Sequence, residues 1–443
     1  MKTVLRLAIA GGDPAVPPGS HARWPEITDK DRAAIGRVLD SGVLYGPNAT
    51  QTAALEREWS EYTGTRFALL TNSGTAALHC AVVAAGIGPG DEVIVPAFSF
   101  VATPMAVLQA GGVPVFCDVD LRTHTLDHRL IEERITERTR AVMPVHVHGL
   151  PADMDEIRAI AARHGLAVIE DACQSHGALY RGVRTGGLGD AAAFSLNGSK
   201  HLAAGEGGLF VTNDEQALLA ARRLAIFGED TPPTGPGQYR AYWSHGLGWN
   251  YRAHELTAAL ARSQLDRLEE RVATAQRNAA ILTRGLADLP GLVPPHIPED
   301  RTCVFYRYRI GIDADALGFR GAPLELRDRL LYALQREGVA SSLWQLLPLP
   351  AQPVFRRPVG PWRPATDRAP VAPWDKAEHP EAARLLESSI VLGTGDEPLF
   401  AQPAELMEGY LEAFEKVIEA IDTVLGAPYS PVEAWPPREP PPL

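Results

Sequence analysis

The sequence contains little cysteine and no long apolar run, and each absence excludes a class of protein. Its 443 residues include four cysteines, which are widely spaced and form no Cys-x-x-Cys pair. This pattern is typical of free thiols in a reducing compartment and gives no zinc signature. No apolar run approaches the roughly 18 residues that a membrane-spanning helix needs. We therefore expect a cytoplasmic protein without a membrane segment.

The chain also lacks an excess of basic residues. It contains 42 lysines and arginines against 54 aspartates and glutamates, so its net charge at pH 7 is −12. A general nucleic-acid-binding role is not expected, because that role needs basic groups to neutralise phosphates. A local basic pocket is not excluded. The first residues, MKTVLRLAIA, are interrupted by Arg6 and too short for a signal peptide, so we interpret them as mature protein.

Short apolar segments alternate with helical patterns from about residue 52 onward. Such segments, separated by helices of about ten residues, predict βαβ units and a largely parallel sheet. The expected strands are apolar throughout, which is typical when helices cover both faces of a sheet. They are residues 67–70, 92–95, 113–117, 141–145, 166–169, 191–196 and 209–212, and the expected helices are 52–62, an Ala-rich segment from 74, 101–109 and 154–164.

We expect an arm, two domains and a tail. The arm is residues 1–25, the large domain 26–270, a smaller α+β domain 271–425, and an extended or disordered proline-rich tail 426–443. Thr28 is placed to cap a helix over 29–41. The other expected elements are a long helix over 254–286, a strand over 303–311, a helix over 323–337, a loop rich in proline and tryptophan over 344–374 and a last helix over 404–425.

One lysine stands between two apolar segments. The segment 191–196 leads into the polar turn Asn197-Gly198-Ser199, then Lys200, and the glycine-rich 205–208 leads into the next strand. Lysine is seldom buried without a partner, and desolvation lowers its pKa and makes it a usable amine nucleophile. The alternative is a surface lysine on a glycine-rich turn.

A second feature is the sequence Asn72-Ser73-Gly74-Thr75, which follows an expected strand and opens a helix. Free N–H groups and the helix dipole at such a point favour a phosphate, although an ordinary helix cap has the same residues. GIGPGD at 86–91 follows a helix instead of a strand, so we reject a nicotinamide site there.

Acidic and aromatic residues follow two other expected strands. Glu170 and Asp171 end the strand 166–169, where an acid serves either as a helix cap or as the partner of a buried cation such as a pyridinium nitrogen. Phe98 and Phe100 follow the strand 92–95, where one of them could stack on a flat ring. The alternative for both is core packing.

Six segments carry a resemblance to a known family. They are SGTAAL at 73–78, PAFSFVAT at 96–103, VHVHGLPADMD at 145–155, IEDACQSHGA at 169–178, FSLNGSKHLAAGEGG at 194–208 and NYRAHELTAAL at 250–260. In this order they resemble the DegT/DnrJ/EryC1/StrS family of sugar and cyclitol aminotransferases, over about residues 5–425. The resemblance implies an α/β fold, the fold type I of pyridoxal-phosphate-dependent transferases, with a mostly parallel central sheet and a smaller α+β domain.

The resemblance also implies a role for each matching residue. Lys200 would form a Schiff base with pyridoxal 5′-phosphate, and Asp171 would pair with the pyridinium nitrogen. Lys200 would then serve as general base and acid in transfer of an amino group from glutamine or glutamate to a cyclic ketone. The other implied cofactor contacts are Gln174 near the phenolic oxygen, Phe100 on the ring, Gly74, Thr75 and Ser195 at the phosphate, and Asn250 at the phosphate of the neighbouring subunit in a homodimer.

The substrate is less well defined than the reaction. The N-terminal LAIAGGDPA and the segment at 145–155 are similar to the branch that acts on keto-cyclitols such as scyllo-inosose and to 3-amino-5-hydroxybenzoate synthases. The segment LWQLLPLPAQPVF at 343–355 has Pro350 where the nucleotide-sugar branch has histidine, which favours a cyclitol over a nucleotide-linked sugar. Asn197 replaces an aromatic residue of many members. Candidate substrate contacts are Tyr45, His146, His148, Tyr306 and Arg307, each of which could equally be structural.

Two alternatives to an aminotransferase of antibiotic biosynthesis stay open. A pyridoxal-phosphate lyase could dehydrate or aromatise a ring ketone without an amino donor. Family members that are dehydratases carry histidine at the Schiff-base position, and Lys200 here favours transamination. A non-catalytic family member acting in a complex, through the proline-rich tail, is disfavoured by the presence of Lys200, Asp171 and Gln174.

Overall fold

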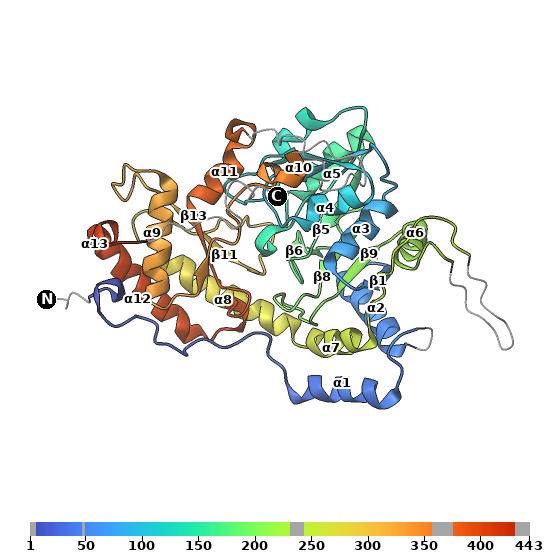
Figure 1. The fold of residues 1–443 in the computed structure, drawn as a ribbon, viewed down its shortest axis with the longest axis horizontal. Coiled ribbons are helices and arrows are strands. Elements are labelled where there is room, and N and C mark those ends of the chain that lie inside the picture. Colours follow the sequence, from blue (N-terminus) through green and yellow to red (C-terminus); the bar gives the residue numbers. More distant parts are fainter. Residues whose placement is uncertain (1–5, 47–48, 231–242, 357–374, 430–443) are drawn as a thin grey trace, which may run out of the picture.

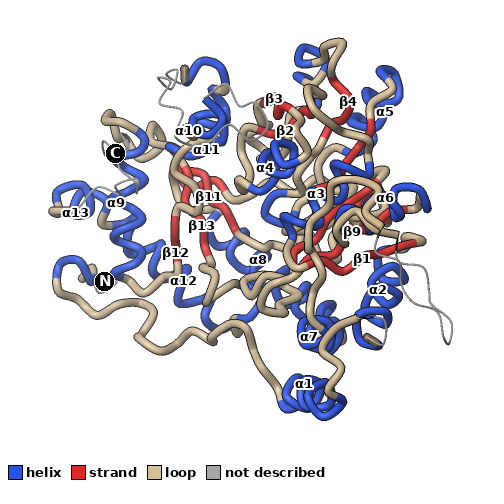
Figure 2. Tube along the Cα trace, turned by 45° about the vertical axis from the view of Figure 1, so that its right-hand side comes forward, coloured by secondary structure: helices blue, strands red, loops and turns tan. Residues whose placement is uncertain are grey.

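A seven-stranded sheet forms the centre of the larger part of the molecule. The computed structural model describes residues 6–46, 49–230, 243–356 and 375–429. The strand order is β1-β9-β8-β5-β4-β2-β3, and β9 runs antiparallel to β1 and β8 while all other neighbours are parallel (Figures 1 and 2). The expected mostly parallel sheet is therefore confirmed. Its strands are β1 (Phe67–Thr71), β2 (Glu92–Pro96), β3 (Val113–Cys117), β4 (Thr139–Val142), β5 (Ala167–Asp171), β8 (Ala191–Ser195) and β9 (Gly208–Thr212).

Helices cover both faces of this sheet, because consecutive strand residues point to opposite sides. Leu69 and Phe210 pack against one group of helices, and the adjacent residues Leu70 and Leu209 pack against the other. The first group is α3 (Gly74–Ala84), α4 (Ala102–Gln109) and α6 (Glu215–Ala225), and the second is α2 (Thr50–Thr63), α5 (Met154–His164) and α7 (Glu255–Leu265). The helix α6 was not predicted, although Asp214 caps it and its apolar face is buried.

The helix α1 (Asp29–Ser41) has the bounds that the sequence predicts. Thr28 caps it by accepting from Asp31 N–H, and Gly42 ends it at a φ of +65°. The helix packs on α7 through Ala34, Val38 and Ala259. A short hairpin, β6 (Leu179–Tyr180) and β7 (Val183–Arg184), lies between β5 and β8 in the chain.

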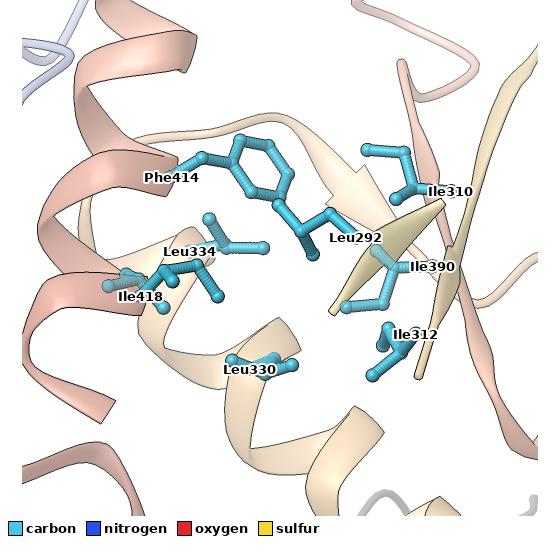
Figure 3. A pocket seen from close by; sticks show the side chains of 9 residues that line it. Leu292, Ile310, Ile312, Leu330, Leu334, Ile390, Phe414 and Ile418 are labelled. Atoms are coloured by element: carbon cyan, nitrogen blue, oxygen red, sulfur yellow. The ribbon is translucent and has the colours of Figure 1, made fainter. Parts of the chain in front are cut away.

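A second, four-stranded sheet forms a smaller α+β unit with its own core. The strand order is β10 (Leu292–Val293), β11 (Tyr308–Ile312), β13 (Ser389–Leu392), β12 (Ser341–Ser342), all antiparallel. Figure 3 shows apolar side chains of this sheet meeting those of two helices, with Phe414 opposite Leu292. The helices α9 (Pro323–Arg336), α12 (Ala404–Glu419) and α13 (Ile421–Gly426) contribute to this core. The helices α10 (Pro353–Arg356) and α11 (Pro380–Glu387) contact residues of the large sheet and its loops.

One helix joins the two cores. Leu268, at the start of α8 (Leu268–Leu286), packs in the core of the large sheet, and Leu282 packs in the core of the small unit. The single helix predicted over 254–286 is wrong: Asp266 and Arg267 separate α7 from α8. The helix predicted over 404–425 is likewise two helices, because α12 ends at Glu419 and α13 begins at Ile421.

The N-terminal segment packs on the small unit before it crosses to the large one. Leu7 and Val16 belong to the core of the small unit, and the segment then runs along the outside to α1 (Figure 1). Most of the proline-rich tail and the segment 357–374 of the predicted loop lie outside the described residues. In the described part of the chain, no helix is both long and apolar enough to cross a membrane.

Candidate active site

The candidate site lies where the large sheet meets the small unit. Lys200 follows β8, and its Nζ atom is 3.9 Å from the ring centroid of Tyr306, which precedes β11 of the small unit. The Ser199 and Tyr306 hydroxyls are 3.2 Å apart. Burial raises the pKa of Tyr306, but Lys200, Arg307 and the Ser199 hydrogen bond lower it, and the net pKa is about 8. The lysine therefore lies on an aromatic face, where a cation is stabilised.

The start of α3 lies directly against the end of β8. Ser73 caps the helix by accepting from Ala76 N–H at 3.1 Å. A Cβ atom at Gly74 would lie 2.9 Å from Cβ of Ser195, closer than real Cβ contacts allow, so only glycine fits this approach. Helix geometry leaves the N–H groups of Gly74 and Thr75 without partners inside the helix. These groups and the Ser195 hydroxyl suit a phosphate.

Asp171 is a buried carboxylate at the end of β5. It accepts hydrogen bonds from the Thr103 hydroxyl at 2.6 Å and from Cys173 N–H at 3.2 Å. Among the described residues it forms no ion pair within 4.0 Å. Buried charges are normally paired, so Asp171 suits a cationic group such as a protonated pyridine nitrogen.

Cys173 lies between the Gly74 turn and Asp171. Its sulfur would lie 3.2 Å from a Cβ atom at Gly74, and its pKa is raised by burial and by Asp171, while Lys200 opposes the rise. The thiol is therefore neutral and packs between the Gly74 turn and the Asp171 carboxylate. The ends of β5 and β8 and the start of α3 thus form one site, as expected for the carboxyl edge of a mostly parallel sheet.

Gln174 and Phe100 lie at the borders of the same site. The Gln174 side-chain oxygen accepts from His148 N–H at 2.8 Å. Phe100 precedes α4 and is 51% exposed, which leaves its ring available for stacking. Phe98 is 1% exposed and packs against Trp344 and His148, so it is a core residue.

Asn250 lies beside the turn Asn72–Thr75 of its own chain. Its carbonyl accepts from the Asn72 side chain at 3.2 Å, and its side-chain oxygen accepts from Arg252 at 3.0 Å. The Arg252 guanidinium is 5.7 Å from the Tyr45 ring and 5.4 Å from the Phe227 ring, and both rings are exposed. A contact of Asn250 with a neighbouring subunit stays a prediction.

The five candidate substrate residues fall in different environments. Tyr306 lies beside Lys200, the Arg307 guanidinium lies 4.4 Å from the Tyr306 ring, and Tyr45 lies at the surface near Arg252. His146 is fully buried: its Nε2 atom is 2.9 Å from Glu170, and its Nδ1 atom accepts from Ala152 N–H at 3.1 Å. His146 therefore has no free polar atom for a ligand, whereas His148 borders a cavity described below.

The sequence reasoning did not single out Thr103 or Ser199. Thr103 anchors Asp171, and Ser199 hydrogen-bonds Tyr306. Both lie inside segments that carry the family resemblance, which would have been the signal to examine them. Their partners are 68 and 107 positions away in the chain, a separation that no local pattern encodes.

Comparison with known proteins agrees with this geometry. Residues 25–370 match the DegT/DnrJ/EryC1/StrS aminotransferase family. The chain is 35% identical over 428 residues to the L-glutamine:scyllo-inosose aminotransferase of Streptomyces griseus, covering 94% of this chain and 99% of that protein. It is 41% identical over 283 residues to the GDP-perosamine synthase of Caulobacter vibrioides, covering 61% and 74%.

A solved structure gives the same result for the fold. The crystal structure of 3-amino-5-hydroxybenzoic acid synthase aligns with a TM-score of 0.77 and 28% identity, covering 90% of this chain and 99% of that one. The predicted fold type is therefore confirmed, and the site geometry fits the cofactor that this fold type carries. The chain belongs to the DegT/DnrJ/EryC1/StrS aminotransferase family of pyridoxal-phosphate-dependent enzymes.

Proposed function

We propose that this enzyme transfers an amino group from glutamine or glutamate to the ketone of a cyclic polyol. The observation that carries the proposal is the convergence of Lys200, Asp171 and the Gly74 turn on one site. Lysine, a buried carboxylate and a phosphate-binding helix start are the three groups that pyridoxal phosphate needs.

The position of each proposed cofactor-binding residue in the structure suits its role. Gly74, Thr75 and Ser195 would hold the phosphate, and Asp171, fixed by Thr103, would hold the ring nitrogen protonated. Phe100 would stack on the ring, with Gln174 near its phenolic oxygen. Bound pyridoxal phosphate supplies an electron sink for the carbanion that forms when a Cα proton leaves.

Lys200 performs the proton transfer. As a free amine it takes the Cα proton of the donor and returns a proton when the ketone is aminated, which is general base and acid catalysis. The Tyr306 ring stabilises the ammonium form between these steps, because it lies 3.9 Å from Nζ. Ser199 keeps the Tyr306 hydroxyl in place.

A cyclitol is the favoured amino acceptor. The scyllo-inosose aminotransferase aligns over nearly the full length of both chains, whereas the GDP-perosamine synthase aligns over 61% of this chain. Pro350 stands where the nucleotide-sugar branch has histidine. A nucleotide-linked keto-sugar is the alternative acceptor. A role in aminocyclitol antibiotic biosynthesis follows from the cyclitol, and four free thiols fit the cytoplasm.

A lyase is the second candidate reaction. It is favoured by the structural likeness to 3-amino-5-hydroxybenzoic acid synthase. A lyase needs no amino donor, so analysis of products with and without glutamine separates the two reactions.

The working unit in this proposal is a homodimer with two shared sites. Tyr45, Phe227, Trp243 and Leu247 are exposed, and Tyr45 and Phe227 both lie around Arg252, next to Asn250. Exposed apolar groups of this kind mark interfaces. Mixing an inactive Lys200→Ala protein with an inactive Asn250→Ala protein tests the sharing. Recovery of activity supports shared sites, and no recovery from two well-folded parents contradicts them.

Absorption spectroscopy tests the proposed function first. The purified protein should show the visible band of lysine-bound pyridoxal phosphate, and L-glutamine or L-glutamate should bleach it. The Lys200→Ala protein should not show this bleaching when the amino acid is added. A band that no amino acid changes would contradict transamination and favour the lyase, and absence of the band after reconstitution would contradict the assignment of Lys200.

A further inference from the structure

A polar cavity lies beside the candidate site, against the segment that leads into β11. Phe305 and Arg307 lie in the irregular segment before β11, with Phe305 at a φ of +46°, and Arg309 lies in the strand itself. They line the cavity together with His124 and His148 from the large domain. Tyr306, in the same segment, contacts Lys200. The cavity is therefore adjacent to the proposed catalytic lysine without being lined by it.

Arg309 brings an unpartnered hydrogen-bond donor to this cavity. The residue is 1% exposed, and two of its nitrogens are used: Nε donates to His148 Nε2 at 3.0 Å, and Nη1 donates to the Ser389 hydroxyl at 2.7 Å. Its Nη2 atom is buried and has no hydrogen-bond partner among the described residues. Buried donors are normally paired.

His148 brings a second unpartnered donor. Its Nε2 atom accepts from Arg309, so in the neutral ring the proton is on Nδ1. Burial and the nearby Arg309 lower the pKa of His148, which keeps the ring neutral. Nδ1 is also buried without a partner in the described part of the chain. Arg309 and His148 thus both line the cavity, and each carries a buried donor without a partner in the described part of the chain, so a ligand bound against them would accept hydrogen bonds.

The arginines that line the cavity indicate the charge of its ligand. Arg307 is 6% exposed, and its Nη1 atom donates to the carbonyls of Tyr306 and Thr394. Within the described residues, neither Arg307 nor Arg309 has a carboxylate within 4.0 Å. Burial lowers the pKa of Arg309 to about 9, since a buried cation without a counter-charge is unfavourable. A neutral water would accept the hydrogen bonds but would not supply the missing charge.

We propose that this cavity binds the carboxylate of a small organic acid. The guanidinium of Arg309 offers the planar donors that suit a carboxylate, and His148 Nδ1 offers a second direction. The carboxylate has two sources: a free acid such as formate, or the amino donor, since glutamine and glutamate both carry one. The second source rests on the proposed function, and the first does not.

Thermal unfolding of the holoenzyme in sodium formate tests the binding. Formate should raise the melting temperature of the wild-type protein more than that of Arg309→Met, and the variant's affinity should be roughly 10- to 150-fold weaker, as for loss of a charged hydrogen bond. Arg320→Met, at an exposed ion pair elsewhere, is the matched control and should respond as the wild type. An equal response of wild type and Arg309→Met overturns the proposal.

A crystal of the wild-type holoenzyme grown in formate keeps the test independent of a variant's folding. Density for formate within hydrogen-bond distance of Arg309 Nη2 and His148 Nδ1 supports the proposal. Density for water alone, or for a carboxylate side chain of a partner subunit, overturns it.

Kinetics then separate the two sources. If the donor supplies the carboxylate, formate competes with glutamine, and Arg309→Met raises KM for glutamine with little change in kcat. If a free acid binds, formate stabilises the protein without competing. If the protein binds formate but transfers no amino group, the proposed function is refuted, whereas the proposed carboxylate site is still supported.

Discussion

The Nζ atom of Lys200 lies 3.9 Å from the centre of the Tyr306 ring, and the two residues come from different parts of the fold. Lys200 follows a strand of the large sheet, and Tyr306 leads into the small one. The geometry of the proposed catalytic site therefore depends on how the small unit packs on the large sheet. Changes at this contact should alter the charge of Tyr306 without unfolding either core.

The first prediction concerns the ionisation of Tyr306. Its pKa of about 8 is below the ordinary value of about 10, so the folded protein stabilises the phenolate. The resulting stability is fully present above pH 10 and is lost as the pH falls through about 8. Ultraviolet titration of the cofactor-free protein should show one tyrosine ionising near pH 8. Tyr306→Phe should lack this step, and Lys200→Met should move it upward.

The other buried tyrosines should not obscure the ionisation of Tyr306 in this titration. Burial raises the pKa of Tyr62, Tyr308 and Tyr410 well above 10, so they ionise at higher pH. If the step near pH 8 persisted in Tyr306→Phe, its assignment would be wrong.

The second prediction concerns the close approach at Gly74. In Gly74→Ala the new Cβ atom would lie 2.9 Å from Cβ of Ser195, so α3 must shift away from β8. We expect a loss of about 1–3 kcal/mol of stability and roughly tenfold weaker cofactor binding, since the proposed phosphate contacts lie at this junction. Thermal unfolding and cofactor titration measure the two effects.

Gly36→Ala is the matched control for this change. Gly36 lies in α1, and a Cβ atom there meets nothing within 4 Å. The substitution should stabilise the helix by up to about 1 kcal/mol and leave cofactor binding unchanged. Equal cofactor affinity of Gly74→Ala and the wild type would contradict a phosphate site at this turn.

The third prediction concerns Asp171. Asp171→Asn removes the charge from a buried group that Thr103 hydrogen-bonds, so a protonated ring nitrogen would lose its counter-charge. A loss of about 3 kcal/mol corresponds to roughly 10²-fold in kcat. Thr103→Val keeps the charge and removes one hydrogen bond, so its effect on kcat should be smaller. We therefore expect kcat to be lowest for Asp171→Asn, intermediate for Thr103→Val and highest for the wild type. A lower kcat for Thr103→Val than for Asp171→Asn would contradict the assignment.

The sequence predicted the elements whose pattern is local. The bounds of α1 and α5 were correct because Thr28 and Gly42 cap α1, and apolar spacing and Gly165 define α5. The break between α7 and α8 was missed because Asp266 and Arg267 are ordinary helix residues in composition. There the chain turns so that Ala259 packs on α1 and Leu282 packs in the other core, a tertiary reason with no local signal.

The residues of the candidate site also fall into those with a local sequence signal and those without one. Lys200, Asp171 and Gly74 could be proposed as site residues because strand ends in a parallel sheet converge, and motifs mark them. The partners that set their properties could not. Tyr306 is 106 positions from Lys200 in the chain, and the pairing of Arg309 with His148 spans 161 positions. Only the packing of the small unit on the large sheet brings these residues together.

The last prediction concerns His146, which the sequence offered as a substrate contact and the structure buries. His146 Nε2 bonds Glu170, whose carboxylate also accepts from the N–H groups of Gly186, Leu188 and Gly189. In His146→Ala, buried polar partners are left unsatisfied, which costs about 1–3 kcal/mol each. Urea unfolding should show this loss, while KM for donor and ketone stays unchanged. His128→Ala is the control, because His128 bonds Asp153 in a partly exposed pair worth less than about 1 kcal/mol. A His146→Ala protein with wild-type stability and a raised KM would instead make His146 a substrate contact.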